Sequence, residues 1–143
     1  MQYKRTKYIS LFEGKCRQSD VDGKEIKVSI SGIQVNVKLA TSDTTKYTGM
    51  MHSSEPSGNN GMMFVYDSDE IRRFWMKNVK YPLDIVFFNS KMEMVDHFTM
   101  KAYNGESDND LKIYKSSKPA TFAIELPSGW CKHNLKPNCR LTI

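Results

Sequence analysis

The sequence is poor in cysteine: only Cys16, Cys131 and Cys139 are present, and no Cys-x-x-Cys pair occurs. An odd and sparse set is typical of reduced thiols rather than of a disulfide framework. A disulfide between Cys131 and Cys139 would need an oxidising compartment. Cys131, His133 and Cys139 could be read as three zinc ligands, but their spacing matches no closed structural zinc site. We therefore predict no metal site and no cofactor.

Long apolar runs are also missing. No segment approaches the length of a membrane-spanning helix, so no membrane span is predicted. The N-terminal residues 1–7 are basic, yet the residues that follow are too polar for the apolar centre of a signal peptide. Both absences favour the cytoplasm, or an assembly that is built there.

Charge of one sign is not concentrated anywhere along the chain. The formal net charge is +5, and the basic residues are spread out rather than gathered into a run. Such a mild excess permits weak attraction to polyanions but indicates no specific nucleic-acid binding. The Gly-x-Ser-x-Gly, phosphate-loop and His-Glu-x-x-His motifs are absent as well, and no nucleophile has an evident activator beside it.

What is present fits one globular domain with a buried core: 143 residues, of which 39% are hydrophobic and 26% charged. In residues 33–39 aliphatic side chains alternate with polar ones, which is the period of a half-buried strand. Ser31-Gly32 just before it is a candidate two-residue hairpin turn, because glycine readily adopts positive φ. In residues 83–88 both faces are largely apolar, which predicts a central strand covered on both sides.

Short strands with turn signals between them predict a mainly-β fold class, a compact antiparallel β-sandwich or barrel of about eight strands. One short helix is expected at about residues 43–52, with Thr41, Ser42 or Asp43 as its cap and Tyr47 on its inward side. Gly49 would lie inside this helix, where a close approach of another backbone would explain it. No strand–helix–strand alternation is apparent. The expected strands are residues 26–30, 33–39, 61–66, 73–77, 83–88, 92–100, 120–126 and 139–143.

The densest group of polar chemistry lies in residues 74–85. Trp75 and Lys77 are expected on one face of a strand, where they could form a platform for a sugar ring or a peptide, or act as a rim anchor and an edge lysine. Asn78 is expected to turn the chain in the left-handed region. Asp84 interrupts an apolar strand and needs a partner, either Lys77 or the backbone of residues 78–81, or a ligand. The candidate binding residues are Trp75, Lys77, Asn78 and Asp84.

Glu125 is a second carboxyl group in an apolar strand. If Asp84 and Glu125 faced each other across a cleft, they could serve as the paired carboxylates of a hydrolase. His52 follows the predicted helix and could act as a base. Nothing in the sequence shows that these groups meet, so Asp84, Glu125 and His52 are candidates without an assigned catalytic role.

Five segments occur in an order that is similar to a known family. The sequence resembles, over about residues 33–143, the uncharacterised bacterial and archaeal family called domain of unknown function 192. The resemblance implies a compact mainly-β domain and assigns no biochemical activity. The segments that carry it are Gly49-Met50-Met51-His52, Gly61-Met62-Met63-Phe64-Val65, Phe74-Trp75-Met76-Lys77-Asn78, Pro82-Leu83-Asp84-Ile85 and Ala123-Ile124-Glu125-Leu126-Pro127-Ser128-Gly129.

The sequence departs from the pattern of that family at three places. Ser53 stands where the family usually has arginine, Thr45-Lys46 replaces an acidic–basic pair, and Asn138-Cys139 replaces a Gly-Asp turn. A charged site that used those positions in relatives would be incomplete here.

Three functional hypotheses follow. The preferred one is a non-enzymatic binding domain that engages a protein or a saccharide through Trp75, Lys77 and Asn78. The second is a small hydrolase that uses Asp84 and Glu125. The third is a structural component of a larger assembly, to which the domain of residues 33–143 docks through an N-terminal extension, residues 1–32. The oligomeric state is left open.

Overall fold

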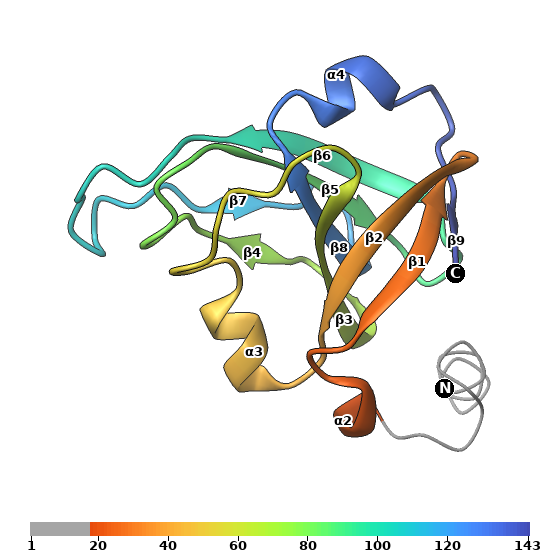
Figure 1. Ribbon diagram of the computed structural model, residues 1–143, viewed down its shortest axis with the longest axis horizontal. Helices are drawn as coiled ribbons and strands as arrows, with labels where there is room; N and C mark the ends of the chain where they lie inside the picture. The colour runs from red at the N-terminus through yellow and green to blue at the C-terminus, as the bar shows by residue number, and fades with distance from the viewer. Residues whose placement is uncertain (1–17) are drawn as a thin grey trace.

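A seven-stranded sheet forms the body of the protein in the computed structural model, which describes residues 18–143 (Figure 1). Cys16 lies outside the described residues. The docking role expected for the extension therefore stays a prediction. The elements are α2 (Gln18–Val21), β1 (Glu25–Ile30), β2 (Ile33–Ala40), α3 (Asp43–Thr48), β3 (Asn60–Glu70), β4 (Arg73–Phe74), β5 (Leu83–Phe88), β6 (Met94–Met100), β7 (Tyr114–Lys115), β8 (Ala120–Pro127), α4 (Trp130–Asn134) and β9 (Leu141–Thr142).

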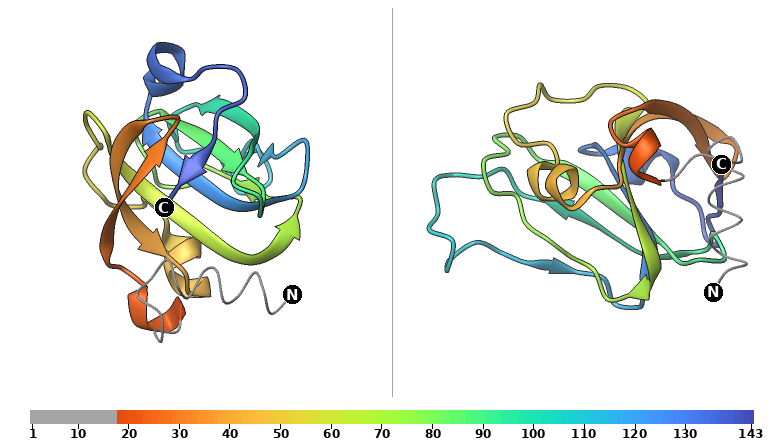
Figure 2. Two further views of the ribbon diagram at one scale, coloured as in Figure 1. Left: turned by 90° about the vertical axis from the view of Figure 1, so that its right-hand side faces the viewer. Right: turned by 90° about the horizontal axis from the view of Figure 1, so that it is seen from below.

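The strands follow the order β6-β5-β8-β3-β2-β1-β9, and β4 and β7 form a separate pair. The sheet curls, as can be followed in Figure 2, until its two ends approach each other. The amide of Leu141, on β9, donates to the carbonyl of Met92 at 2.8 Å, and the amide of Met94, on β6, donates to the carbonyl of Cys139 at 3.1 Å. The curled sheet confirms the mainly-β class.

One pairing differs from the expected antiparallel arrangement. β2 and β3 run parallel, with Val37 opposite Gly61. The segment 41–59, which contains α3, joins them, and a crossover of this length is what a parallel pair needs. One strand–helix–strand connection therefore occurs, within a sheet whose other pairings are antiparallel.

The hairpin and the central strand were predicted correctly. Ser31 and Gly32 both have positive φ, 47° and 85°, and they join β1 to β2. All six residues of β5 are buried, and this strand lies between β6 and β8. β1 falls before the predicted domain boundary at residue 33, yet it pairs with β2 along its whole length.

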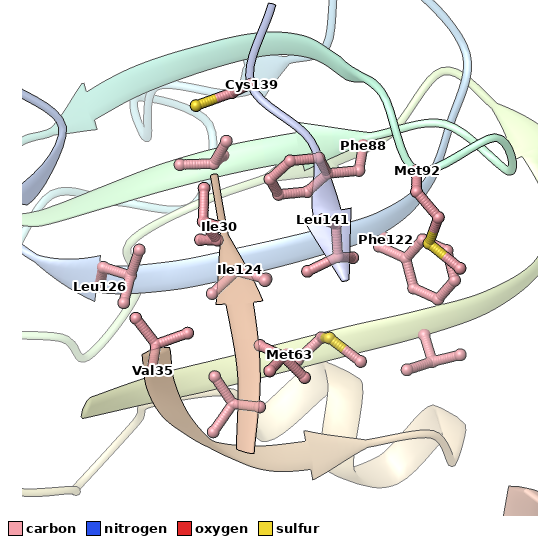
Figure 3. Packing of buried hydrophobic residues seen from close by; sticks show 14 of the residues in the cluster. Ile30, Val35, Met63, Phe88, Met92, Phe122, Ile124, Leu126, Cys139 and Leu141 are labelled. Atoms are coloured by element: carbon pink, nitrogen blue, oxygen red, sulfur yellow. The ribbon is translucent and has the colours of Figure 1, made fainter. Parts of the chain in front are cut away.

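Alternating side chains divide the core into two clusters, one on each face of the sheet. The inner cluster lies inside the curl and includes Val86, Phe88, Ile124 and Leu126; Figure 3 shows part of its packing. The outer cluster lies on the other face and includes the neighbouring β5 side chains Ile85 and Phe87, with Phe64 from β3. The sheet is covered on both faces, so its central strands β5 and β8 are buried on both faces and mostly apolar.

Helix α3 is shorter than predicted. Ser42 is its N-cap, and the Ser42 hydroxyl accepts a hydrogen bond from the amide of Thr45 at 3.1 Å. The helix ends at Gly49, whose φ of 50° is a conformation that favours glycine. Gly49 therefore terminates the helix, and the expected position inside it was wrong. Within residues 18–143, no helix has the length and apolar character needed to cross a membrane.

Candidate functional site

A pocket of about 220 Å³ opens beside α3, on the face of the sheet that carries the outer cluster. The end of α3 and the turn after it form one side, and the segment that follows β4 forms another. Five aromatic side chains line it: Tyr47, Phe64, Tyr66, Phe74 and Trp75. Aliphatic walls come from Met50, Met51 and Val79, and ionisable groups from Lys46, Arg73, Lys77 and Glu125.

Edge-to-face contacts hold the aromatic walls in place. The rings of Phe64 and Phe74 have their centroids 4.9 Å apart with planes at 80°, and those of Tyr47 and Trp75 lie 6.4 Å apart at 67°. These are favoured geometries for aromatic pairs. Because Tyr47 comes from α3 and Trp75 from the segment after β4, their contact joins two segments that line the pocket.

Glu125 is the buried polar group of this pocket. Its exposed fraction is 4%, and no hydrogen-bond or ion-pair partner for its side chain is found within residues 18–143. Burial raises the pKa of Glu125 to about 8, so the carboxyl group is mostly protonated at neutral pH. A buried polar group without a partner is costly and calls for an explanation. Glu125 lines the pocket wall, so this unsatisfied group faces a cavity rather than packed protein.

A close backbone contact fixes the position of Glu125. β3 passes β8 so closely at Gly61 that a Cβ atom there would lie 2.0 Å from the carbonyl oxygen of Glu125. Only glycine fits without a shift of one strand. Glycine is therefore required at position 61, because β3 lies so close there to β8, the strand that carries Glu125.

Lys46 is the half-buried cation of the pocket. Its Nζ lies 4.1 Å from the centroid of the Tyr66 ring. Burial lowers the pKa of Lys46, against the opposing charges of Asp43 and Asp67. The guanidinium carbon of Arg72 lies 3.8 Å from the centroid of the same ring, and burial raises the pKa of Tyr66 to about 12. Lys46 has no ion-pair partner in the part of the chain that the structure describes.

Two of the four predicted binding residues, Trp75 and Lys77, line the pocket. They follow β4 rather than lying within a strand, because β4 ends at Phe74. The Nζ of Lys77 is 5.4 Å from the Trp75 ring centroid and 3.0 Å from Oδ2 of Asp108. Asn78 is not among the lining residues; its φ of 59° confirms the left-handed turn predicted for it.

Asp84 lies elsewhere and has other partners than those expected. Its side chain is buried, Oδ1 accepts a hydrogen bond from the Thr99 hydroxyl at 2.8 Å, and Oδ2 accepts one from the Cys131 amide at 2.9 Å. The expected pairing with Lys77 or with the backbone of residues 78–81 was wrong. Asp84 instead anchors the first turn of α4 to the sheet.

The two carboxyl groups do not face each other. Glu125 is paired with Ile85 and Asp84 with Leu126, so the two side chains point to opposite faces of the sheet. The hydrolase hypothesis required both groups in one cleft, and the register contradicts it. His52 is exposed in the turn after α3, with φ of 60°, and does not line the pocket.

Neither cysteine of the described region belongs to a metal cluster. Within residues 18–143, no group of three or more His, Cys, Asp or Glu side chains is arranged to hold a metal ion. Cys131 and Cys139 are buried free thiols, and burial, followed by the charge of Asp84, raises the pKa of Cys131. Such thiols are unreactive, and here they serve as core residues.

Sequence reasoning missed most of the pocket. Lys46, Phe64, Tyr66 and Phe74 were not singled out, and Tyr47 was placed on the inward side of the helix although it is 62% exposed. The available signal was Glu125, a lone carboxyl group in an apolar strand. The pairing register that shows which side chains surround Glu125 cannot be read from the sequence.

Comparison with known proteins gives a family and a fold. The profile of the family called domain of unknown function 192, described as "Uncharacterized ACR", matches residues 26–143. No curated protein matches the chain.

Two solved structures share the architecture. A crystal structure from Sinorhizobium meliloti 1021, described as a "putative transcription regulator", has a TM-score of 0.72 at 24% identity, over 85% of this chain and 95% of that one. A protein of unknown function from Novosphingobium aromaticivorans DSM 12444 has a TM-score of 0.69 at 20% identity, over 83% and 85% of the two chains. Identities this low show the fold alone. The family match covers most of the sequence, and the chain therefore belongs to the domain of unknown function 192 family.

Proposed function

We propose that the protein is a non-enzymatic binding domain and that the pocket beside α3 holds one ring of a saccharide. The observation that carries the proposal is the unpartnered side chain of Glu125 in a pocket walled by aromatic rings. A sugar ring has an apolar face of C–H groups that packs on aromatic rings, and hydroxyl groups around its edge. It could therefore contact Trp75 or Phe74 and at the same time supply a hydrogen-bond partner to Glu125.

The size of the pocket supports a single ring. Pockets for drug-sized ligands span roughly 300–1,000 Å³, and this one is smaller, at about 220 Å³. A ligand of one ring, free or at the end of a longer chain, suits that volume. Apolar walls with a small number of polar groups, here Lys46, Arg73, Lys77 and Glu125, follow the general pattern of small-molecule sites.

A protein partner fits the surface less well. Stable protein interfaces bury about 1,200–2,000 Å² in total and use apolar anchors near their centre. Among the described residues, the exposed large apolar side chains are Tyr47 and Ile113, and both line this pocket. The exposed apolar surface is thus gathered at the mouth of a small cavity rather than over a wide face.

The test uses the two tryptophans as reporters during titration with a panel of monosaccharides. Trp75 lines the pocket, whereas Trp130 is buried in the inner cluster, with its indole N–H donating to Oδ1 of Asn59 at 2.9 Å. We expect a ligand-induced change in fluorescence that is lost in Trp75→Phe and kept in the matched control Trp130→Phe. If no saccharide changes the emission, or if the change survives in Trp75→Phe, this pocket is not a saccharide site. A co-purifying protein that quenches Trp75 would favour protein docking instead.

A further inference from the structure

We infer that the saccharide ring bound in this pocket carries a carboxylate, as in a hexuronic acid, because Lys46 and Glu125 are two pocket groups that both lack a polar partner within residues 18–143. The inference rests on the proposed function and narrows it to one class of ligand. A ring with an acidic substituent and several hydroxyl groups can satisfy both side chains at once, whereas a neutral sugar leaves the ammonium group unpaired.

The first argument concerns the two lysines of the pocket. Lys77 is already paired, with its Nζ 3.0 Å from Oδ2 of Asp108. Lys46 has the Tyr66 ring at 4.1 Å and no ion-pair partner within residues 18–143. Because Lys46 is half-buried, its ammonium group has lost part of its hydration. A carboxylate at this position would offset that loss with a charge-assisted hydrogen bond.

The second argument concerns the sign of the charge around the pocket. Lys46, Lys77 and Arg73 all line it, and Arg73 is exposed and adds positive charge at the mouth. Three cations in one small site disfavour a cationic ligand and attract an anionic one. The aromatic rings could otherwise have suggested a quaternary ammonium ligand, but the protein's own cations Lys46 and Arg72 already lie over the Tyr66 ring.

The third argument concerns Glu125, which must not repel an anion. Among the described residues, the ionisable groups that interact with it are the hydroxyl groups of Tyr66 and Tyr81. Its burial keeps the carboxyl group protonated at neutral pH, so it carries no charge and can donate a hydrogen bond to a ring or hydroxyl oxygen. A simple aromatic acid would satisfy Lys46 but leave Glu125 without a partner, which is why a hydroxylated ring fits better.

The experiment measures affinities for the full chain by calorimetric or NMR titration with D-glucuronate, D-galacturonate and D-glucose. A short oligogalacturonide is added to distinguish a free sugar acid from the end of an acidic polysaccharide. We expect at least one hexuronate to bind about tenfold or more tightly than glucose at neutral pH, since a desolvated charge pair contributes at this scale. In Lys46→Met the ratio of hexuronate affinity to glucose affinity should fall toward one. The matched control Lys38→Met, an exposed lysine on β2 outside the pocket, should leave it intact.

Each outcome separates the two proposals. Equal or tighter binding of glucose overturns the acidic-ligand inference while the saccharide site stands, and no binding of any sugar overturns both. Retained selectivity in Lys46→Met would also overturn the inference.

In addition, hexuronate affinity of the unmodified protein should fall between about pH 7 and about pH 9, as Glu125 ionises. Glu125→Gln should remove that fall, and identical pH profiles for the two proteins would rule out contact between Glu125 and the ligand.

Discussion

Glu125 on β8 lies directly opposite Ile85 on β5, so its side chain shares a face of the sheet with Ile85 and points into the pocket beside α3. One residue along, Asp84 lies opposite Leu126 and points to the other face, where it holds α4. Two carboxyl groups on adjacent strands thus have separate environments. One is satisfied by the protein's own donors, and the other has no hydrogen-bond or ion-pair partner within residues 18–143.

The buried carboxyl group of Glu125 makes the free energy of unfolding depend on pH. The folded-state pKa of Glu125 is raised to about 8, against an ordinary value of 4.5. Between these values the unfolded chain releases the proton and the folded chain keeps it, so stability falls as pH rises through this range. Glu125→Gln removes the titration. We expect it to be more stable than the unmodified protein at pH 7, by on the order of 3 kcal/mol.

Denaturant unfolding at about pH 5, 7 and 9 measures this effect. The difference between Glu125→Gln and the unmodified protein should grow with pH and then level off above the folded-state pKa. Glu55→Gln is the matched control, since Glu55 is exposed and outside the pocket. Parallel stability curves for Glu125→Gln and the unmodified protein would mean that Glu125 is ionised and paired in the fold.

Asp84→Ala should destabilise the protein without altering the pocket. The substitution removes acceptors from the Thr99 hydroxyl and from the buried Cys131 amide, and the amide is then left without an acceptor. A loss of about 3 kcal/mol is expected for two hydrogen bonds to a buried carboxylate. Thr99→Val removes only the hydroxyl and should cost about 1 kcal/mol. Thermal unfolding measures the loss, and saccharide titration checks the pocket; a loss of binding in folded Asp84→Ala would show that the two faces are coupled.

Much of the fold could be predicted because it depends on local patterns. The alternation in residues 33–39 and the largely apolar run at residues 83–88 reflect the period of a strand, and the Ser31-Gly32 turn reflects the φ angles of a hairpin. The left-handed conformation of Asn78 is another feature that the local sequence predicts. These features need no knowledge of which strands become neighbours.

The remaining features depend on contacts between residues far apart in the sequence. The parallel pairing of β2 with β3 follows from the path of the 41–59 segment, and the partner of Asp84 is brought to it by α4. The sequence identified both Asp84 and Glu125 as carboxyl groups in need of a partner. Only the β5–β8 register decides which of them receives one from the protein.

Gly61→Ala tests the close approach of β3 and β8. An alanine Cβ would lie 2.0 Å from the Glu125 carbonyl oxygen, so one of the two central strands must shift. We expect a loss of more than about 3 kcal/mol, in the range of overpacking at a rigid backbone contact. Gly105→Ala is the control: it has φ of 81° and no atom within 4 Å, and should cost only about 1–2 kcal/mol. Comparable thermal midpoints for the two variants would contradict the close contact.

Asp22 holds the helix that carries Lys46 and Tyr47 into the pocket. Its carboxylate accepts hydrogen bonds from the Thr45 hydroxyl at 2.6 Å and from the Thr41 amide at 2.7 Å. Burial alone would raise the pKa of Asp22, but these bonds, with those from Ser42, outweigh it and hold the pKa well below its usual range. This stabilisation is present above the unfolded-state pKa and is lost as pH falls below about 4.

Asp22→Asn should therefore unfold at a lower temperature than the unmodified protein at pH 7, with a difference that shrinks as the pH is lowered toward about 2. The variant replaces one acceptor oxygen with a donor, so part of the bonding to Thr41, Ser42 and Thr45 is lost at the start of α3. Because α3 forms one side of the pocket, ligand affinity should weaken together with stability. Asp43→Asn is the control, since Asp43 is exposed in the first turn of the same helix. A constant difference in unfolding temperature between Asp22→Asn and the unmodified protein at every pH would show that the hydrogen bonds do not depend on the charge of Asp22.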